Sequence, residues 1–186
     1  LPKKYGKIPV KGISLNSKKT KNKDAFFAIE GTKISGTKFI TSAIKKGASA
    51  IITEKKIKDN NYQTPIIPVH DARKTLSEAC SKFYRKKPKN ILAVTGTNGK
   101  SSVADFFYQI LSLNKRAVAS IGTLGINSKN IKKKTNLTSL DPLFLHKNLQ
   151  DLAVKKVNFV ILEASSHGLD QKRLNNLNIK IGAFTN

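Results

Sequence analysis

The segment Thr95–Ser101, with the sequence Thr-Gly-Thr-Asn-Gly-Lys-Ser, constrains the fold of this chain more than any other feature. It follows an apolar run of strand length at Ile91–Thr95 and precedes the helical pattern of Ser101–Leu113. A glycine loop between a strand and a helix directs backbone N–H groups and the helix N-terminus toward one point, where phosphate oxygens can bind. The segment therefore predicts a parallel α/β sheet with a phosphate-binding loop.

The loop has the residue types that phosphate chemistry needs. Lys100 can reach the outer phosphates of a nucleotide, and the Ser101 hydroxyl can bind magnesium. The match to the general P-loop pattern is incomplete, because Val94 stands where that pattern has its first glycine. A purely structural tight turn is the alternative interpretation. The residues that we expect to hold phosphate oxygens are Gly96, Thr97, Asn98, Gly99, Lys100 and Ser101.

A second buried-strand pattern, Phe159–Leu162, ends in the carboxylate of Glu163. In open α/β sheets, ligands bind beyond the carboxyl ends of the strands, which is also where the glycine loop is expected. A carboxylate at that position can hold magnesium against a triphosphate. The structural alternative is that Glu163 caps a helix or forms a surface pair.

The chain as a whole is predicted to form two α/β units. Residues 1–87 form a small N-terminal α/β domain, and the run from Arg85 to Pro88 breaks a helix and marks the boundary. Residues 88–186 alternate strand and helix and are expected to form the first part of a parallel, doubly wound sheet. The expected strands are 25–29, 50–53, 66–69, 91–95, 117–121, 159–164 and 179–184, the expected helices are 39–46, 72–84, 101–113 and 141–154, and 127–134 is expected to be a loop.

Composition narrows the class of protein. The formal net charge is +24, but lysines are spread along the whole chain, which indicates compositional bias, with attraction of anionic ligands as the alternative. No aromatic RNA-binding motif and no zinc spacing predicts a specific nucleic-acid partner. No apolar run approaches the roughly 20 residues of a membrane helix, so no membrane insertion is expected. The single cysteine, Cys80, is expected to be buried and fits a cytoplasmic location. His70 and His146 are expected at the surface.

Several segments resemble the Mur ligase family. Thr95–Ser101 is similar to its Gly-Thr-Asn-Gly-Lys-[Ser/Thr] loop, in which the first glycine of the general pattern is also missing. Glu163–Arg173 resembles the Glu-Val-Ser-Ser-His-Gly-Leu segment of one branch, MurE. The remaining similar segments are Gly12–Lys18, Phe26–Ile40, Ile121–Gly125 and Thr138–Pro142. The resemblance spans nearly the whole chain.

The resemblance implies an ATP-dependent amide ligase of cell-wall synthesis. Such an enzyme adds diaminopimelate or lysine to UDP-N-acetylmuramoyl-L-alanyl-D-glutamate through an acyl phosphate, with ATP and Mg²⁺. It also implies a P-loop central domain and a monomer. Because the sequence ends directly after a strand pattern and contains no methionine, we expect a truncated chain that cannot catalyse the reaction alone.

The resemblance also implies individual roles. Lys100 and Glu163 are the expected catalytic residues, and Ser101 with Glu163 would hold magnesium. His167 either lines the site or makes a local hydrogen bond. The residues expected to bind the UDP-muramoyl-peptide substrate are Ser17, Thr138, Ser139, Ser165, Gln171 and Arg173.

The chain departs from the family pattern at four positions. Asn16 and Ser35 stand where the family has Asp, Lys18 stands where it has Arg, and Leu140 stands where it has Pro. Three alternative functions remain open at this point. The chain could belong to a sister ligase such as a folylpolyglutamate synthase, to a basic P-loop protein that binds nucleic acid, or to a non-catalytic binding module derived from a ligase.

Overall fold

The computed structural model describes residues 5–31, 34–57, 62–134 and 140–186. The chain divides into two compact units, residues 1–76 and residues 77–186. The division falls within helix α2 (Ala72–Phe83), and the domain boundary predicted after residue 87 lies beyond the end of that helix. That boundary stays a prediction. Among the described residues, no helix has the length and apolar character needed to cross a bilayer.

The first unit is built on a four-stranded parallel sheet in the order β1-β2-β3-β4. Its short helix α1 (Ile40–Lys45) follows the 3-10 turn η3 (Gly36–Phe39) and packs Ala43 against Phe26 and Ile51. Gly47 follows this helix with a positive φ of 90°, a conformation that commonly ends helices. The strands are β1 (Gly12–Ser14), β2 (Asp24–Ala28), β3 (Ala50–Thr53) and β4 (Ile66–Pro68).

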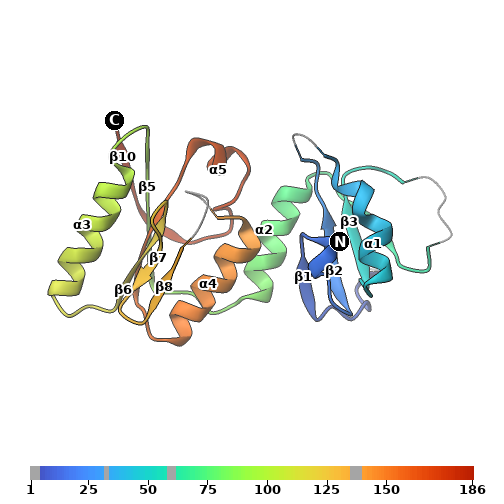
Figure 1. Cartoon of the computed structure of the whole chain (residues 1–186), viewed down its shortest axis with the longest axis horizontal. Coiled ribbons are helices and arrows are strands. Elements are labelled where there is room, and N and C mark those ends of the chain that lie inside the picture. The colour runs from blue at the N-terminus through green and yellow to red at the C-terminus, as the bar shows by residue number, and fades with distance from the viewer. Residues whose placement is uncertain (1–4, 32–33, 58–61, 135–139) are drawn as a thin grey trace. The chain divides into compact units, whose positions relative to one another are not determined.

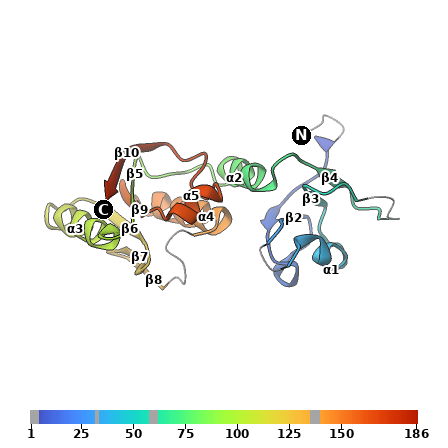
Figure 2. The same ribbon diagram turned by 90° about the horizontal axis from the view of Figure 1, so that it is seen from above.

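The second unit contains a six-stranded sheet in the order β10-β5-β9-β6-β7-β8 (Figures 1 and 2). The first four strands in this order run parallel, so their carboxyl ends meet at one edge of the sheet, which we call the carboxyl edge. The strands are β5 (Asn90–Gly96), β6 (Val118–Gly122), β7 (Gly125–Ser128), β8 (Ile131–Lys133), β9 (Phe159–Glu163) and β10 (Ile179–Thr185).

Two helices cover opposite faces of this sheet, as the alternation of side chains along β9 requires. Ile161 packs with Ala104 of α3 (Lys100–Leu113), whereas Val160 and Leu162 pack with Leu149 of α4 (Pro142–Val154). Asp141 caps α4 by accepting a hydrogen bond from the Phe144 N–H at 2.9 Å, with Pro142 in the first turn. The predicted α/β architecture is confirmed.

Two local predictions were wrong. The expected loop at 127–134 contains the end of strand β7 and all of strand β8, because Ile126 and Ser128 are buried on either side of the more exposed Asn127 and pair in a hairpin despite the lysines. His146 is fully buried, since it lies on the face of α4 that packs against the sheet. His167 lies in a short helix, α5 (Ser166–Asp170), where it makes a local hydrogen bond, one of the two alternatives expected from the sequence.

Candidate functional site

The glycine loop lies at the carboxyl edge of the second sheet, between β5 and α3. Gly99 caps α3 with a φ of 78°, a conformation that glycine adopts without steric cost. Strand β10, which pairs with β5, leads into a segment that supports the loop. The Asn98 N–H in the loop donates to the carbonyl of Asn186, directly after β10, at 2.6 Å. The hydroxyl of Thr185 lies 2.5 Å from the Asn98 carbonyl oxygen. Strand β10 therefore holds the loop in place at its middle.

Lys100 lies in the first turn of α3 and its ammonium folds back over the loop. Its Nζ atom donates to the carbonyl of Gly96 at 2.6 Å and to the carbonyl of Thr97 at 2.9 Å. A positive charge is thereby held over the loop at the N-terminus of a helix, where the helix dipole also attracts anions. The arrangement is suited to an anionic ligand with several oxygens.

Glu163 ends β9 and is 4% exposed, which is a costly environment for a carboxylate unless hydrogen bonds compensate it. The Ser101 hydroxyl donates to Oε2 at 2.9 Å. Thr123 donates twice, from its N–H to Oε1 at 3.1 Å and from its hydroxyl to Oε2 at 3.0 Å. Gly122 allows this close packing, because a Cβ at that position would overlap the carboxylate.

The resulting cluster joins three strands at the carboxyl edge: Ser101 comes after β5, Thr123 after β6 and Glu163 from β9. One carboxylate and two hydroxyl groups form a set of hard oxygen donors, which is the kind that Mg²⁺ prefers. The donor set fits magnesium, and it lies beside a loop suited to phosphate. A metal-bridged phosphate group is thus chemically compatible with this edge of the sheet.

The segment after Glu163 holds three of the six predicted substrate residues, Ser165, Gln171 and Arg173. The Ser165 hydroxyl caps α5 by accepting from the Gly168 N–H at 3.0 Å. Gln171 accepts from Nη2 of Arg173 at 2.7 Å, and its amide nitrogen lies 2.7 Å from Nε2 of His167. These contacts are local in sequence and orient the guanidinium of Arg173. Thr138 and Ser139 lie outside the described residues.

Ser17 belongs to the first unit, where it follows β1 in the 3-10 turn η2 (Ser17–Lys19) and is 6% exposed. Asn16 caps this turn, since its Oδ1 accepts from the Lys18 N–H at 2.9 Å. Ser35 caps η3 in the same way. Both departures from the family pattern thus retain a short polar side chain that caps a helical turn.

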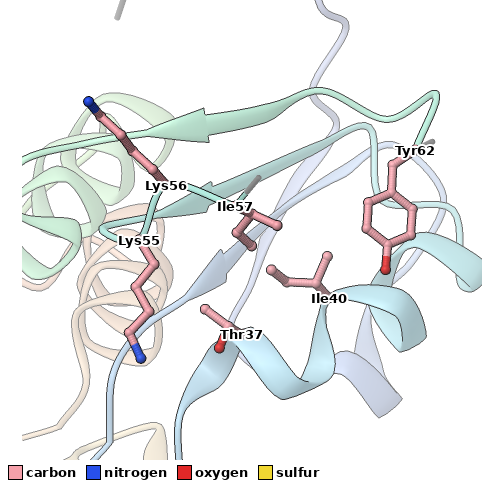
Figure 3. A pocket seen from close by; sticks show the side chains of 6 residues that line it. All are labelled: Thr37, Ile40, Lys55, Lys56, Ile57 and Tyr62. Atoms are coloured by element: carbon pink, nitrogen blue, oxygen red, sulfur yellow. The ribbon is translucent and has the colours of Figure 1, made fainter. Parts of the chain in front are cut away.

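The first unit also has a concavity near the carboxyl ends of its strands, with a volume of about 290 Å³ (Figure 3). Lys55 and Lys56 follow β3, and the Lys55 ammonium lies 3.2 Å from Oε1 of Glu30. The Ser35 hydroxyl donates to the same carboxylate at 2.5 Å, and this hydrogen bond lowers the pKa of Glu30. The remaining lining residues are Thr37, Ile40, Ile57 and Tyr62.

A buried titratable cluster lies in the core of the second unit. Burial, followed by the positive charge of Lys87, lowers the pKa of His146 to about 4. Burial raises the pKa of the Cys80 thiol to about 12, which makes this cysteine an inert apolar residue, as predicted. Both side chains are fully buried.

Sequence reasoning placed Lys100, Ser101 and Glu163 at one edge, and the structure brings Ser101 and Glu163 into contact. It assigned no role to Thr123, although the resemblance included Ile121–Gly125 and could have indicated one. It also missed Thr185, because a strand residue that hydrogen-bonds to a loop carbonyl leaves no motif in the sequence.

Comparison with known protein families identifies both parts of the chain. Residues 9–84 match the model described as Mur ligase family, catalytic domain. Residues 94–186, half of the chain, match the Mur ligase middle domain. The chain belongs to the Mur ligase family.

Related proteins place this Mur ligase family member near one branch. A protein of Rickettsia montanensis named UDP-N-acetylmuramoyl-L-alanyl-D-glutamate--2,6-diaminopimelate ligase is 46% identical over 95% of the chain and 37% of its own length. A protein of the same name from Brucella melitensis is 40% identical over the whole chain and 38% of its own length. The chain thus spans less than two-fifths of these relatives.

Solved structures of the Mur ligase family agree with this fold. A structure of a UDP-N-acetylmuramoyl-L-alanyl-D-glutamate--2,6-diaminopimelate ligase matches with a TM-score of 0.82 and 33% identity, over 95% of this chain and 36% of that chain. A MurF ligase from Thermotoga maritima in complex with ADP matches with a TM-score of 0.56 and 27% identity, over 86% and 33% of the two chains.

Proposed function

We propose that this chain is the substrate- and nucleotide-binding part of an ATP-dependent amide ligase. The ligase adds the third peptide residue to UDP-N-acetylmuramoyl-L-alanyl-D-glutamate in peptidoglycan synthesis. The observation that carries the proposal is the buried Glu163 carboxylate, which contacts the Ser101 hydroxyl at the end of the glycine loop. Relatives that are 40–46% identical and carry this ligase name support the choice of reaction.

In this proposal the second unit binds the triphosphate of ATP. The N–H groups of the loop and the Lys100 ammonium contact phosphate oxygens, and Lys100 exchanges its two loop carbonyl partners for them. Ser101, Thr123 and Glu163 supply oxygens for Mg²⁺, which when bound neutralises charge on the transferring phosphoryl group. Lys100 and Glu163 are therefore the proposed catalytic residues.

The acceptor substrate is assigned two sets of residues. Ser17 would bind the UDP end, whereas Thr138, Ser139, Ser165, Gln171 and Arg173 would bind the muramoyl-peptide. Arg173 suits a carboxylate or phosphate, because its planar guanidinium donates two parallel hydrogen bonds and Gln171 already fixes its orientation. The names of the relatives favour diaminopimelate as the added amino acid.

The proposed chemistry has two steps. The γ-phosphoryl group of ATP moves to a side-chain carboxylate oxygen of the substrate glutamate, and ADP leaves. The incoming amine then attacks the acyl carbon, loses a proton, and phosphate leaves with its electron pair. Both steps depend on positioning and charge neutralisation, so the chain needs no nucleophile of its own. We further propose that the protein acts in the cytoplasm as a monomer.

A ligation assay tests this function in the protein that carries this chain. UDP-muramoyl-dipeptide, ATP and Mg²⁺ are supplied with either diaminopimelate or lysine, and the tripeptide product is separated by chromatography. The proposal expects a product that requires all four components and is formed with diaminopimelate. A product that forms equally well without ATP, or no product while an L-glutamate-tailed folate is extended, would overturn it.

A further inference from the structure

The edge of the second sheet opposite the glycine loop carries a basic surface around two adjoining depressions. The loop lies where β5 ends, whereas α3 and α4 both end at the opposite edge, near the turn between β7 and β8 (Figure 1). The depressions have volumes of about 690 Å³ and 410 Å³, and Asn130 and Lys155 line both. We call this region the basal surface, and its defining residues are Leu113, Lys115, Arg116, Lys129, Val154 and Lys155.

The four cations of the basal surface lack acidic partners. Lys115, Arg116, Lys129 and Lys155 are all exposed, and none forms an ion pair within the residues that the structure describes. The C-terminal ends of α3 and α4 together present about one negative charge of helix dipole, which four cations exceed. Among the described lining residues of both depressions, Asp151 is the one carboxylate. The basal surface therefore keeps a net positive charge.

Large apolar side chains flank these cations. Leu113, in the last turn of α3, is 82% exposed, and Val154, at the end of α4, is 60% exposed. Tyr108 and Val157 line the larger depression, so its wall is partly apolar. Exposed apolar residues beside unpaired cations match a ligand that offers both an anionic surface and an apolar phase.

We propose that the basal surface docks the protein on a membrane surface rich in anionic phospholipid. The cations would contact lipid phosphates, and the larger depression would accept a headgroup. Leu113 and Val154 would enter the boundary between headgroups and acyl chains. Each cation near such a surface adds to the attraction, and each buried apolar side chain adds a hydrophobic contribution. Because the surface lies opposite the glycine loop, docking leaves the proposed nucleotide site open.

Nucleic acid is the alternative anionic partner, and the exposed apolar residues distinguish it from a membrane surface. Binding to a phosphate backbone relies on cations and is insensitive to exposed aliphatic side chains. Stacking of bases requires exposed aromatic rings, and the one aromatic residue that lines the larger depression, Tyr108, is half-buried. A lipid surface would contact Leu113 and Val154 as well as the cations, so membrane docking accounts for more of the basal surface than nucleic-acid binding does.

Vesicle co-sedimentation of the full chain tests the proposal. Vesicles of equal parts phosphatidylglycerol and phosphatidylcholine are compared with pure phosphatidylcholine. The variant Lys115→Gln/Arg116→Gln should lower partitioning onto anionic vesicles by about tenfold or more. A control with the same loss of charge, Lys45→Gln/Lys46→Gln in the first unit, should lower it much less. Equal losses in both variants would show diffuse attraction by net charge and overturn the proposal.

A second variant tests the apolar contribution separately. Leu113→Ser/Val154→Ser leaves every charge in place, and both side chains are exposed, so the fold is kept and circular dichroism checks it. Partitioning onto anionic vesicles should fall about tenfold, while retention on heparin stays that of the wild-type chain. Unchanged partitioning of this variant would overturn membrane docking. Binding to single-stranded DNA that is stronger than binding to anionic vesicles and depends on Lys115 and Arg116 would assign the surface to nucleic acid.

Discussion

The carboxyl edges of the two sheets both carry charged and hydroxyl side chains, but they are built differently. In the second unit, a buried carboxylate is held by residues far apart in sequence, since Glu163 contacts Ser101 and Thr123. In the first unit, Glu30 contacts its neighbour Ser35 and the exposed ammonium of Lys55. The second edge is preorganised around a buried carboxylate, whereas the ion pair at the first edge joins more exposed side chains.

The proposed function assigns a different role to each edge. Groups that stabilise developing charge act best when the protein fixes them away from water before reaction. Groups that recognise the distal end of a substrate can remain solvated, because they contribute binding and not chemistry. The comparison predicts large effects for substitutions at the second edge and small effects at the first.

Lys100→Ala should have the largest effect. It removes the ammonium at the start of α3, so the ligation rate in the protein that carries this chain should fall by about a thousandfold, similar to other lost transition-state contacts. The matched control is Lys115→Ala, which removes the same side chain near the other end of the same helix. Single-turnover kinetics on both variants provide the measurement. Comparable rates for the two variants would remove the distinction between the carboxyl edge and the rest of the unit.

Glu163→Gln should have the next largest effect. The substitution keeps the size of the side chain but removes its charge and replaces one acceptor oxygen with an amide donor, so the rate should fall by about a hundredfold. The Mg²⁺ concentration needed for half-maximal rate should also rise. Glu78→Gln on α2 serves as the control for loss of one carboxylate. If Glu163→Gln lowers only the thermal stability and keeps the rate and Mg²⁺ dependence, Glu163 is a structural residue.

Thr123→Val should have an intermediate effect, because it removes one of three described hydrogen bonds to Glu163 and preserves side-chain shape. We expect about a tenfold loss of rate, corresponding to about 1.4 kcal/mol. Thr41→Val in the first unit, which removes a hydroxyl that contacts Tyr62, should leave the rate unchanged. Steady-state kinetics of the two variants compare the two edges directly. A larger loss from Thr41→Val would reverse the comparison.

The core behind the second edge should respond to acid. Burial lowers the pKa of His146 to about 4, below its ordinary value of 6.5. The unfolded chain therefore binds a proton that the folded chain does not, and stability falls as the pH drops from about 6.5 to about 4, by about 3 kcal/mol. Urea unfolding at both pH values should show a smaller loss in His146→Leu. An identical loss in this variant would mean that other groups cause the acid sensitivity.

The smallest effect should come from the first edge. Lys55→Gln removes an ion pair whose side chains are 57% and 35% exposed. Exposed pairs contribute about 0–1 kcal/mol, so the free energy of unfolding should hardly change. Urea unfolding of this variant measures the free energy of unfolding, with Lys56→Gln as the matched control. A loss above about 2 kcal/mol would show that this edge is also preorganised.

The sequence predicted the architecture well where apolar pattern and loop chemistry agree. The strand–loop–helix at Thr95–Ser101 and the strand before Glu163 carry strong local signals, and the structure contains both. The prediction failed where tertiary packing decides. His146 looks polar in isolation, but its position on the inner face of α4 buries it.

Other parts of the site left no pattern to find. The β7–β8 hairpin has one isoleucine in each strand among polar residues and lysines, so its sequence shows no clear strand pattern. The contact between Thr185 and the loop carbonyls joins positions almost ninety residues apart, and only the pairing of β10 with β5 brings them together. Long-range contacts of this kind depend on strand order, which local propensity does not encode.

Nuclear magnetic resonance of the isotope-labelled full chain tests the central claim most directly, because amide shifts report binding residue by residue. Mg-ATP should move the amides of Gly96–Ser101, Thr123 and Glu163, and leave the first unit unchanged. UDP should instead move amides near Ser17, and Lys100→Ala should abolish only the response to ATP. If Mg-ATP leaves the loop amides unmoved, or shifts the edge of the first unit in their place, the assignment of the second carboxyl edge to nucleotide chemistry is wrong.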